Sequence, residues 1–333
     1  MTPAVSILLP VFNARATLAA CLRSVERQLE ERWECVIVDD GSSDGTLALA
    51  RAFAARDSRF RVVATAHSGL VTALNTGLDR CRAPLVARMD ADDVMHRARL
   101  GVQIAALSAP GLAAVGSHVR LFPRRTLRDG WRAYEQWLNG IDSAQQVRDE
   151  AYIECPVVHP TLMIRRDVLA ALRYRDCGWP EDYDLVLRLL GAGHEVGVVP
   201  RRLLAWRDSA ARLSRTSSTY ALDRLTACKA AFLADQFLAG VDTYVLWGHG
   251  GTGRALRRAL VAHGKRPSHV VEVHPGRLGQ TIHGAPVVAP EALRTITGRP
   301  VVVSVAGAGP RRQIREALTT MGFHETRDFV CAA

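Results

Sequence analysis

Residues 34–56 of the chain read ECVIVDDGSSDGTLALARAFAAR, and this stretch falls into three parts. The first part, 34–40, is an apolar run of strand length that ends in two aspartates. The middle part, 41–45, has the glycine, serine and aspartate composition of a turn. The last part, 46–56, predicts a helix. Together they predict the strand–turn–helix unit from which α/β sheets are built.

The same alternation extends over the first 115 residues of the chain. Further strands are expected at 5–12, 61–66 and 84–90, and further helices at 16–29 and 70–81. Strand–helix–strand units of this kind predict a mostly parallel sheet, in which ligands bind beyond the carboxyl ends of the strands. The polar clusters at 13–15, 39–45 and 90–93 each follow a predicted strand, so we expect them along one edge.

Composition narrows the classes of protein to which the chain can belong. Its 333 residues are 48% hydrophobic and 23% charged, as in a globular protein with room for two domains. No apolar run reaches the roughly 18 residues of a membrane span, and the N-terminus does not resemble a signal peptide. We therefore expect a cytoplasmic protein, with peripheral contact at the inner membrane face left open. The seven cysteines include no C-x-x-C pair, so neither a disulfide framework nor a zinc site is predicted.

The net charge of +10 comes from arginine, since Lys229 and Lys265 are the only lysines. These arginines are spread along the chain and form no basic run interleaved with aromatic residues. Nucleic acid is therefore not an expected partner. Attraction to an anionic membrane surface stays open.

Three aspartates fall within four positions at the end of the strand predicted at 84–90: Asp90, Asp92 and Asp93. Carboxylates at this spacing can hold Mg²⁺, which prefers one or two carboxylates together with phosphate oxygens. The alternative is a solvated turn in which Asp93 caps a helix from about 94 to 108. The spacing alone leaves both interpretations open.

A second acidic group, WPEDYD at 179–184, opens a predicted amphipathic helix. Acids in the first turn stabilise a helix through its dipole, and that is one interpretation. The other is that one of them is a general base that removes a proton from an attacking hydroxyl. Trp179 beside them could stack on a sugar ring or belong to the core.

The joint order of these motifs resembles the family 2 glycosyltransferases with the GT-A fold. The matching pieces are SILLPVFNARATLAACLRSV, VIVDDGSSDGT, ALNTGLDRCRAPLVARMDADD, HPTLMIRRDVL and EDYDLVLRLL. The resemblance covers about 1–215 and implies a nucleotide-sugar-binding α/β domain with a mostly parallel central sheet. It implies that Pro10 and Asn13 lie in the nucleotide-binding loop. It also implies that Asp40, with Asp39, contacts the uracil or other base.

For the reaction, the resemblance implies that Asp92 binds Mg²⁺ or Mn²⁺, that Asp90 faces the metal or the ribose of the donor, and that Asp182 is the catalytic base. Asp93 is then the expected helix cap. The implied activity is that of a metal-dependent, inverting, Leloir-type hexosyltransferase. It would move a sugar from a nucleoside diphosphate, most simply UDP, to a glycan, lipid-linked or small-molecule hydroxyl acceptor.

The sequence also departs from the family pattern. Ser209 stands where relatives often have a histidine, so Arg207 and Arg215 become the candidates for diphosphate contact. Trp179 and Glu181 are candidates for contact with the diphosphate or the acceptor. The signature Q-x-x-R-W is absent, so a processive, polymerising synthase is not expected.

After a predicted connecting helix at 216–239, the range 240–333 resembles a small Rossmann-like domain. Its G-x-G-x-x-G motif uses Gly248, Gly250 and Gly253, and Glu272 follows at the end of the next predicted strand. Two roles stay open, ligand binding and packing, the latter including homo-oligomerisation. The alternatives for the whole chain are a nucleotide-dependent oxidoreductase, although no Tyr-x-x-x-Lys pair is present, and a non-catalytic sugar-nucleotide-binding protein.

Overall fold

The structure is a computed structural model that describes residues 2–210 and 212–333. Contacts divide the chain into two compact units. The first consists of Met1–Val147, Pro156–Cys177 and Asp184–Thr216, and the second of Arg148–Cys155, Gly178–Tyr183 and Ser217–Ala333. The second unit therefore takes two short segments from within the range 1–215, which we expected to form one domain.

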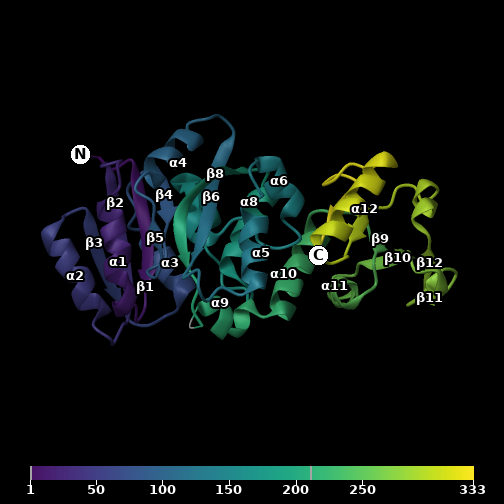
Figure 1. The fold of residues 1–333 in the computed structure, drawn as a ribbon, viewed down its shortest axis with the longest axis horizontal. Helices are drawn as coiled ribbons and strands as arrows, with labels where there is room; N and C mark the ends of the chain where they lie inside the picture. Colours follow the sequence, from purple (N-terminus) through teal and green to yellow (C-terminus); the bar gives the residue numbers. More distant parts are fainter. Residues whose placement is uncertain (1, 211) are drawn as a thin grey trace. The chain divides into compact units, whose positions relative to one another are not determined.

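An eight-stranded sheet forms the centre of the first unit, in the order β3-β2-β1-β4-β7-β6-β8-β5 (Figure 1). Its strands are β1 Val5–Val11, β2 Trp33–Asp40, β3 Phe60–Thr65, β4 Leu85–Arg88, β5 Val94–Met95, β6 Leu112–Phe122, β7 Met163–Arg165 and β8 Glu195–Arg207. β3, β2, β1 and β4 run parallel, and β6 runs parallel to β8, whereas β7 and β5 are antiparallel to their neighbours. The predicted α/β fold with a mostly parallel sheet is confirmed.

Helices cover both faces of the parallel part of this sheet. They are α1 Arg15–Glu26, α2 Thr46–Arg56, α3 Leu70–Leu78 and α4 Arg99–Leu107. Successive residues of a strand point to opposite faces. Ile7 of β1 belongs to the core shared with α1, α2 and α4, whereas Leu8 meets Gly77 of α3 on the other face. Alternate residues of one buried strand therefore fill two separate core layers.

Further along, the helices are short and irregularly spaced. They are α5 Asp129–Leu138, α6 Ala144–Glu150, η1 His159–Thr161, α7 Arg166–Leu172 and α8 Glu181–Gly191. No helix among the described residues is long and apolar enough to span a membrane.

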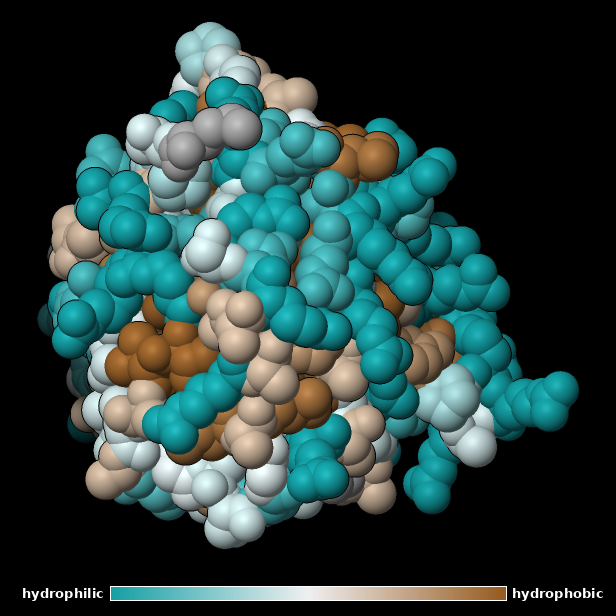
Figure 2. Space-filling model, turned by 90° about the vertical axis from the view of Figure 1, so that its left-hand side faces the viewer, coloured by the Kyte–Doolittle hydropathy of each residue, from teal (hydrophilic) through white to brown (hydrophobic). Residues whose placement is uncertain are grey.

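At the end of the first unit that carries α2 and β3, hydrophilic side chains cover most of the surface and hydrophobic ones gather in one area (Figure 2).

Two predicted helices are wrong in extent. Residues 94–108, expected as one helix capped by Asp93, form β5 followed by α4, because Val94 and Met95 pair with β8. The stretch 216–239, expected as one connecting helix, is divided. It contains the end of α9 Leu213–Thr216, then η2 Ser218–Tyr220 and α10 Leu222–Asp235. The hydroxyl of Ser217 accepts the N–H of Thr219 and holds the break.

The second unit has a six-stranded sheet in the order β11-β12-β10-β9-β13-β14. Its strands are β9 Thr243–Trp247, β10 Arg266–Val271, β11 Thr281–Ile282, β12 Ala285–Val288, β13 Val301–Val303 and β14 Phe329–Cys331. All neighbours are parallel except β11 and β12. Its further helices are α11 Gly251–Ala262, η3 Pro275–Arg277, η4 Pro290–Arg294 and α12 Ala308–Thr320.

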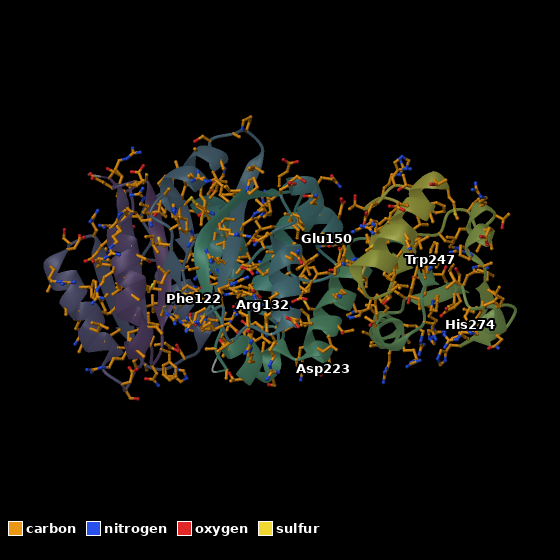
Figure 3. All side chains as sticks on the ribbon, viewed as in Figure 1. Phe122, Arg132, Glu150, Asp223, Trp247 and His274 are labelled. Atoms are coloured by element: carbon orange, nitrogen blue, oxygen red, sulfur yellow. The ribbon has the colours of Figure 1, made fainter. Side chains whose placement is uncertain are left out.

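The segment 148–155 is bound to the second unit by charged side chains. Glu150, labelled in Figure 3, forms an ion pair with Arg315 of α12 at 2.7 Å. Lys229 of α10 donates to the carbonyl oxygen of Ile153 at 2.9 Å. These contacts explain why a segment from within the first 215 residues groups with the C-terminal sheet.

Candidate active site

The polar loops after β1 and β2 meet at the carboxyl edge of the parallel strands, as the sequence predicts. The Oδ1 atom of Asn13 accepts the N–H of Ser43 at 2.9 Å, and the N–H of Asn13 donates to Ser42 Oγ at 2.9 Å. Asn13 has a φ of 47°, a left-handed conformation that asparagine tolerates better than most residues. Pro10 lies within β1, in register with Val38. The predicted nucleotide-binding loop is therefore fixed by bonds to its neighbour.

Asp39 and Asp40 are both buried, but their carboxylates have different partners. Asp40 accepts the N–H of Ser68 at 2.8 Å and that of Gly69 at 2.9 Å, so it anchors the loop that leads into α3. Asp39 accepts the N–H of Ser42 through Oδ2 at 3.1 Å. Its Oδ1 atom is buried and has no hydrogen-bond partner among the described residues. Of the two, Asp39 keeps an acceptor available for a ligand.

An aromatic pair lies beside these carboxylates. The ring of Phe12 stacks on that of His67, with centroids 4.2 Å apart, and His67 Nδ1 lies 2.8 Å from a carboxylate oxygen of Asp40. Phe12 is 47% exposed, which is unusual for a large apolar side chain. We did not select either residue from the sequence. The position of Phe12 between Pro10 and Asn13 was a signal that could have indicated it. His67 had no such signal, because it comes from a different loop.

Asp90, Asp92 and Asp93 form a compact carboxylate cluster. One oxygen of each lies within 4.8 Å of the others, close enough to share a metal ion. Arg88 donates to Asp90 Oδ1 at 2.7 Å. The N–H of Arg207 donates to Asp93 Oδ1 at 2.7 Å, and its Nε donates to the carbonyl oxygen of Asp92 at 2.7 Å. Strands β4 and β8 therefore hold the cluster from two sides.

The electrostatics of the cluster favour a bound cation. Burial raises the pKa of Asp92, and burial raises that of Asp93 well above its ordinary value; repulsion within the cluster adds to both. For Asp90, burial is the largest single cause and acts in the same direction, but the charges of Arg88, His159 and Arg212 and the hydrogen bond from Arg88 together outweigh it and lower the pKa. A divalent ion would stabilise all three ionised carboxylates.

Asp93 does not have the role that we expected. It is not a helix cap, because β5 follows it directly and α4 begins only at Arg99, after Ala98 as N-cap. Its Oδ2 atom is buried without a hydrogen-bond partner among the described residues. An uncompensated buried oxygen that faces two carboxylates fits a hard cation. The residues present therefore fit Mg²⁺ or Mn²⁺, with Asp93 as a third ligand candidate that sequence reasoning missed.

Three arginines follow β8 or end it, and they differ in their surroundings. Arg215 forms an ion pair with Asp208, so its guanidinium already has an acidic partner. Arg212 lies 4.1 Å from the ring of Trp206, and its charge acts to lower the pKa of all three clustered aspartates. Its Nη1 atom is buried without a hydrogen-bond partner among the described residues. Arg207 and Arg212 therefore join Arg88 as basic residues beside the cluster, and the sequence had indicated Arg207 but not Arg212.

Of the three acids that open α8, one has a structural role and two are candidates for contact with substrate. Asp184 is fully buried and pairs with Arg175 at 2.8 Å and with Arg188 at 2.6 Å, so its role is structural. Glu181 accepts the hydroxyl of Tyr220 at 2.8 Å. Asp182 is half-buried, and its Oδ1 accepts the next backbone N–H in the helix at 2.8 Å.

Glu181, Asp182 and the half-buried Trp179 belong to the second unit, whereas the aspartate cluster belongs to the first. The catalytic role of Asp182, and the contacts expected for Trp179 and Glu181, therefore stay predictions.

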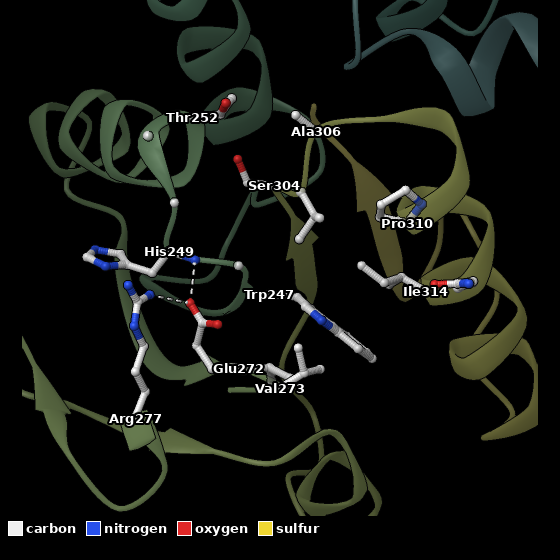
Figure 4. A pocket seen from close by; sticks show the side chains of 16 residues that line it. Trp247, His249, Thr252, Glu272, Val273, Arg277, Ser304, Ala306, Pro310 and Ile314 are labelled. Atoms are coloured by element: carbon white, nitrogen blue, oxygen red, sulfur yellow. Dashed lines mark hydrogen bonds and ion pairs between the residues drawn. The ribbon is translucent and has the colours of Figure 1, made fainter. Parts of the chain in front are cut away.

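In the second unit, the four residues predicted to form a ligand loop come together around one pocket (Figure 4). Gly248 and Gly250 line it, and Gly253 packs against the carbonyl oxygen of Gly248. Glu272 also lines the pocket and accepts the N–H of His249, a residue of the same loop, at 3.1 Å. The strand, turn and helix order that the motif requires is present.

Comparison of the sequence with protein families shows which class this fold and site define. The model of glycosyl transferase family 2 matches residues 6–173, half of the chain, and the chain belongs to this family. The putative glycosyltransferase EpsE of Bacillus subtilis (strain 168) is 28% identical over 230 residues, covering 66% of this chain and 79% of EpsE. The amylovoran biosynthesis glycosyltransferase AmsE of Erwinia amylovora is 31% identical over 207 residues, covering 61% and 75%.

Solved structures share the fold at low sequence identity. TarS 1–349 of S. aureus, in complex with UDP-GlcNAc, aligns with a TM-score of 0.57 and 15% identity, over 79% of this chain and 72% of that one. The mannosyltransferase PcManGT of Pyrobaculum calidifontis, in complex with GDP-Man and Mn²⁺, aligns with a TM-score of 0.53 and 20% identity, over 79% and 70%. These likenesses show a common fold.

Proposed function

We propose that this family 2 glycosyltransferase moves a sugar from a nucleoside-diphosphate donor to a hydroxyl acceptor in glycan biosynthesis, with inversion at the anomeric carbon. The observation that carries the proposal is the cluster of Asp90, Asp92 and Asp93 at the carboxyl edge of the sheet. Three carboxylates in one place are costly without a cation, and a departing diphosphate needs one. AmsE, named for amylovoran biosynthesis, supports a role in glycan biosynthesis.

Asp92 and Asp90 would hold Mg²⁺ or Mn²⁺, with Asp93 as a third ligand. When bound, the ion would supply positive charge to the diphosphate as its bond to the sugar breaks. Arg207 and Arg212 would add charge beside the same oxygens. The Mn²⁺ in the complex of the Pyrobaculum calidifontis mannosyltransferase supports a divalent ion in this fold.

The nucleotide would bind between the first two loops, and we propose UDP. The available Oδ1 atom of Asp39 can accept a hydrogen bond from the base, and the exposed ring of Phe12 offers a face for stacking. Asp40 would act indirectly, by holding the loop that carries His67. The UDP-GlcNAc complex of TarS supports this choice, and the GDP-Man complex makes GDP the comparison to test.

Asp182 would be the catalytic base in a single displacement. The acceptor oxygen forms its bond to the anomeric carbon as the bond from that carbon to the diphosphate breaks. The acceptor proton passes to the carboxylate of Asp182. Glu181, held by the hydroxyl of Tyr220, and Trp179 would position the acceptor beside it.

Asp182→Asn tests the assignment of the base. Donor binding should persist, measured by the thermal shift with UDP- and GDP-sugars and Mn²⁺, while transfer to the acceptor should fall by at least about a hundredfold. Asp129→Asn, at an exposed carboxylate of α5, is the matched control and should leave transfer unchanged. Undiminished transfer by Asp182→Asn would remove Asp182 as the base, and a product with retained anomeric configuration would exclude the single displacement.

A further inference from the structure

A pocket of about 400 Å³ opens at the carboxyl ends of three parallel strands in the second unit (Figure 4). Trp247 ends β9, Val271 ends β10, and Ser304 follows β13; all three line the pocket. From β9 the chain continues to β10 on one side, whereas β13, on the other side of β9, follows later in the chain, so the strand order reverses at β9. Open α/β sheets bind ligands at such a reversal of strand order.

The glycines of the loop between β9 and α11 have two different tasks. A Cβ at Gly253 would lie 2.2 Å from the carbonyl oxygen of Gly248, and Gly248 itself has a φ of 96°, so both positions require glycine for the turn. A Cβ at Gly250 or Gly251 would meet no atom within 4 Å, although both residues line the pocket. The turn is tight, and the space above the start of α11 stays open.

The start of α11 has the properties of an anion site. The helix is 12 residues long, and its N-cap, Gly250, provides no side-chain hydrogen bond to the first-turn N–H groups. Those N–H groups and the helix dipole favour a negative charge in front of the helix. Arg254 and Arg257 of the same helix add positive charge. Burial is the main reason that the pKa of His249 is lowered, and the charges of these two arginines lower it further.

Two buried polar side chains on the wall of the pocket have no hydrogen-bond partner among the described residues. Ser304 is 3% exposed and its Oγ has none; His249 is 7% exposed and its Nε2 has none. A buried polar group without a hydrogen-bond partner destabilises a fold. Figure 4 shows the Ser304 hydroxyl turned toward the first turn of α11, where Thr252 lies. A ligand in front of the helix would supply its missing partner.

Glu272 is positioned to recognise a sugar hydroxyl. Its Oε1 accepts both the N–H of His249, at 3.1 Å, and Nη1 of Arg277, at 3.0 Å. These two bonds fix the carboxylate and leave Oε2 for a ligand. An acid at the end of the second strand of such a unit is suited to a ribose diol.

We propose that this pocket binds one nucleoside diphosphate, free or as part of a nucleotide sugar, as a site additional to the proposed donor site. The diphosphate would lie at the start of α11 within reach of Ser304, and the ribose would lie against Glu272. A dinucleotide is disfavoured, because a dinucleotide-binding domain has two three-strand halves, whereas in the described part of the chain only β13 and β14 lie beyond β9. Binding requires no metal, since helix N–H groups replace the cation.

Calorimetric titration of the full chain with UDP, ADP and NAD⁺ in EDTA tests the proposal. At least one of UDP and ADP should bind, and Asp92→Ala should leave this binding unchanged. Gly250→Ala adds a methyl group to the open space and should weaken it at least about tenfold, whereas Ser304→Ala should weaken it about fivefold. Gly309→Ala in α12, where a Cβ also meets open space outside the pocket, is the matched control and should have no effect.

The proposal is overturned if neither UDP nor ADP binds in EDTA, or if such binding is the same in Gly250→Ala and Ser304→Ala as in the natural protein. It is also overturned if NAD⁺ binds more tightly than both mononucleotides. Comparing the affinity for UDP with that for a UDP-sugar then shows whether the pocket prefers the free nucleoside diphosphate or the nucleotide sugar. Loss of sugar transfer without loss of this binding would count against the proposed function alone.

Discussion

Asp90, Asp92 and Asp93 have the same side chain but three different environments. Arg88 stabilises the ionised form of Asp90, whereas burial and mutual repulsion raise the pKa of Asp92 and Asp93. The backbone N–H of Arg207 holds Asp93 in the cluster. The spacing of the three in the sequence is compatible with a capped turn as well, and only contacts from β8, which is distant in the sequence, show that the three form a cluster.

Asn13 allows the cost of a conformation to be separated from that of a hydrogen bond. Asn13→Gly keeps the left-handed conformation but loses the bond to Ser43, which should lower the free energy of unfolding by about 1 kcal/mol. Asn13→Ala loses the bond and also strains the backbone, so it should cost about 1 kcal/mol more. Urea unfolding of both variants measures the difference, and an alanine variant as stable as the glycine variant would contradict the account.

At the scale of the element, two glycines in helices should respond oppositely to alanine. Helix propensity alone favours alanine by about 1 kcal/mol at both. In α3, however, a Cβ on Gly77 would lie 2.3 Å from Leu8 and 2.8 Å from Val38, and overpacking of this kind costs about 1–3 kcal/mol. In α4, a Cβ on Gly101 meets no atom within 4 Å.

Gly77→Ala should therefore destabilise the protein, and Gly101→Ala should stabilise it by about 0.5 kcal/mol. Thermal unfolding of the two variants provides the comparison. Because each serves as the control for the other, a shift of the same sign in both would contradict the packing of α3 on β1 and β2.

Glu34 of β2 should make stability depend on pH. Burial raises its pKa, but hydrogen bonds from Ser6, Arg82 and Arg61 outweigh this and lower it below the ordinary value of 4.5. A lowered folded-state pKa stabilises the protein above the unfolded-state pKa, and this stabilisation is lost as pH falls through the folded-state pKa. Glu34→Gln should cost about 2 kcal/mol at pH 7. The difference from the natural protein should shrink below about pH 4.5, and a difference that is constant from pH 7 to pH 3 would contradict the assignment.

The first half of the fold follows from the sequence because its elements are locally determined. The strand expected at 34–40 is Trp33–Asp40, and the helix expected at 46–56 is found at Thr46–Arg56. The predictions that were wrong concern elements that depend on distant partners. β5 forms because it pairs with β8, and the local pattern at 94–108 carries no sign of that pairing. The break at Ser217 was visible in principle, because serine competes for backbone N–H groups, but apolar periodicity concealed it.

At the scale of the whole molecule, the candidate site combines residues that the sequence predicts with residues that only the fold brings near. Asn13, Asp39 and Asp92 were selected from motifs, whereas His67 and Arg212 come from segments without a recognisable pattern. The chain belongs to glycosyl transferase family 2, whereas the metal, argued from the aspartate cluster, and the donor, argued from Asp39 and Phe12, are proposals.

The most direct test of the central claim is the release of nucleoside diphosphate from nucleotide sugars. The natural protein should turn over one of the UDP- or GDP-sugars with Mn²⁺ or Mg²⁺ and stop on addition of EDTA. Asp92→Ala should lose at least about a hundredfold in turnover, while Asp129→Ala, at an exposed carboxylate, should match the natural protein. Undiminished turnover by Asp92→Ala, or turnover that EDTA does not affect, would contradict a metal-assisted transfer at this cluster.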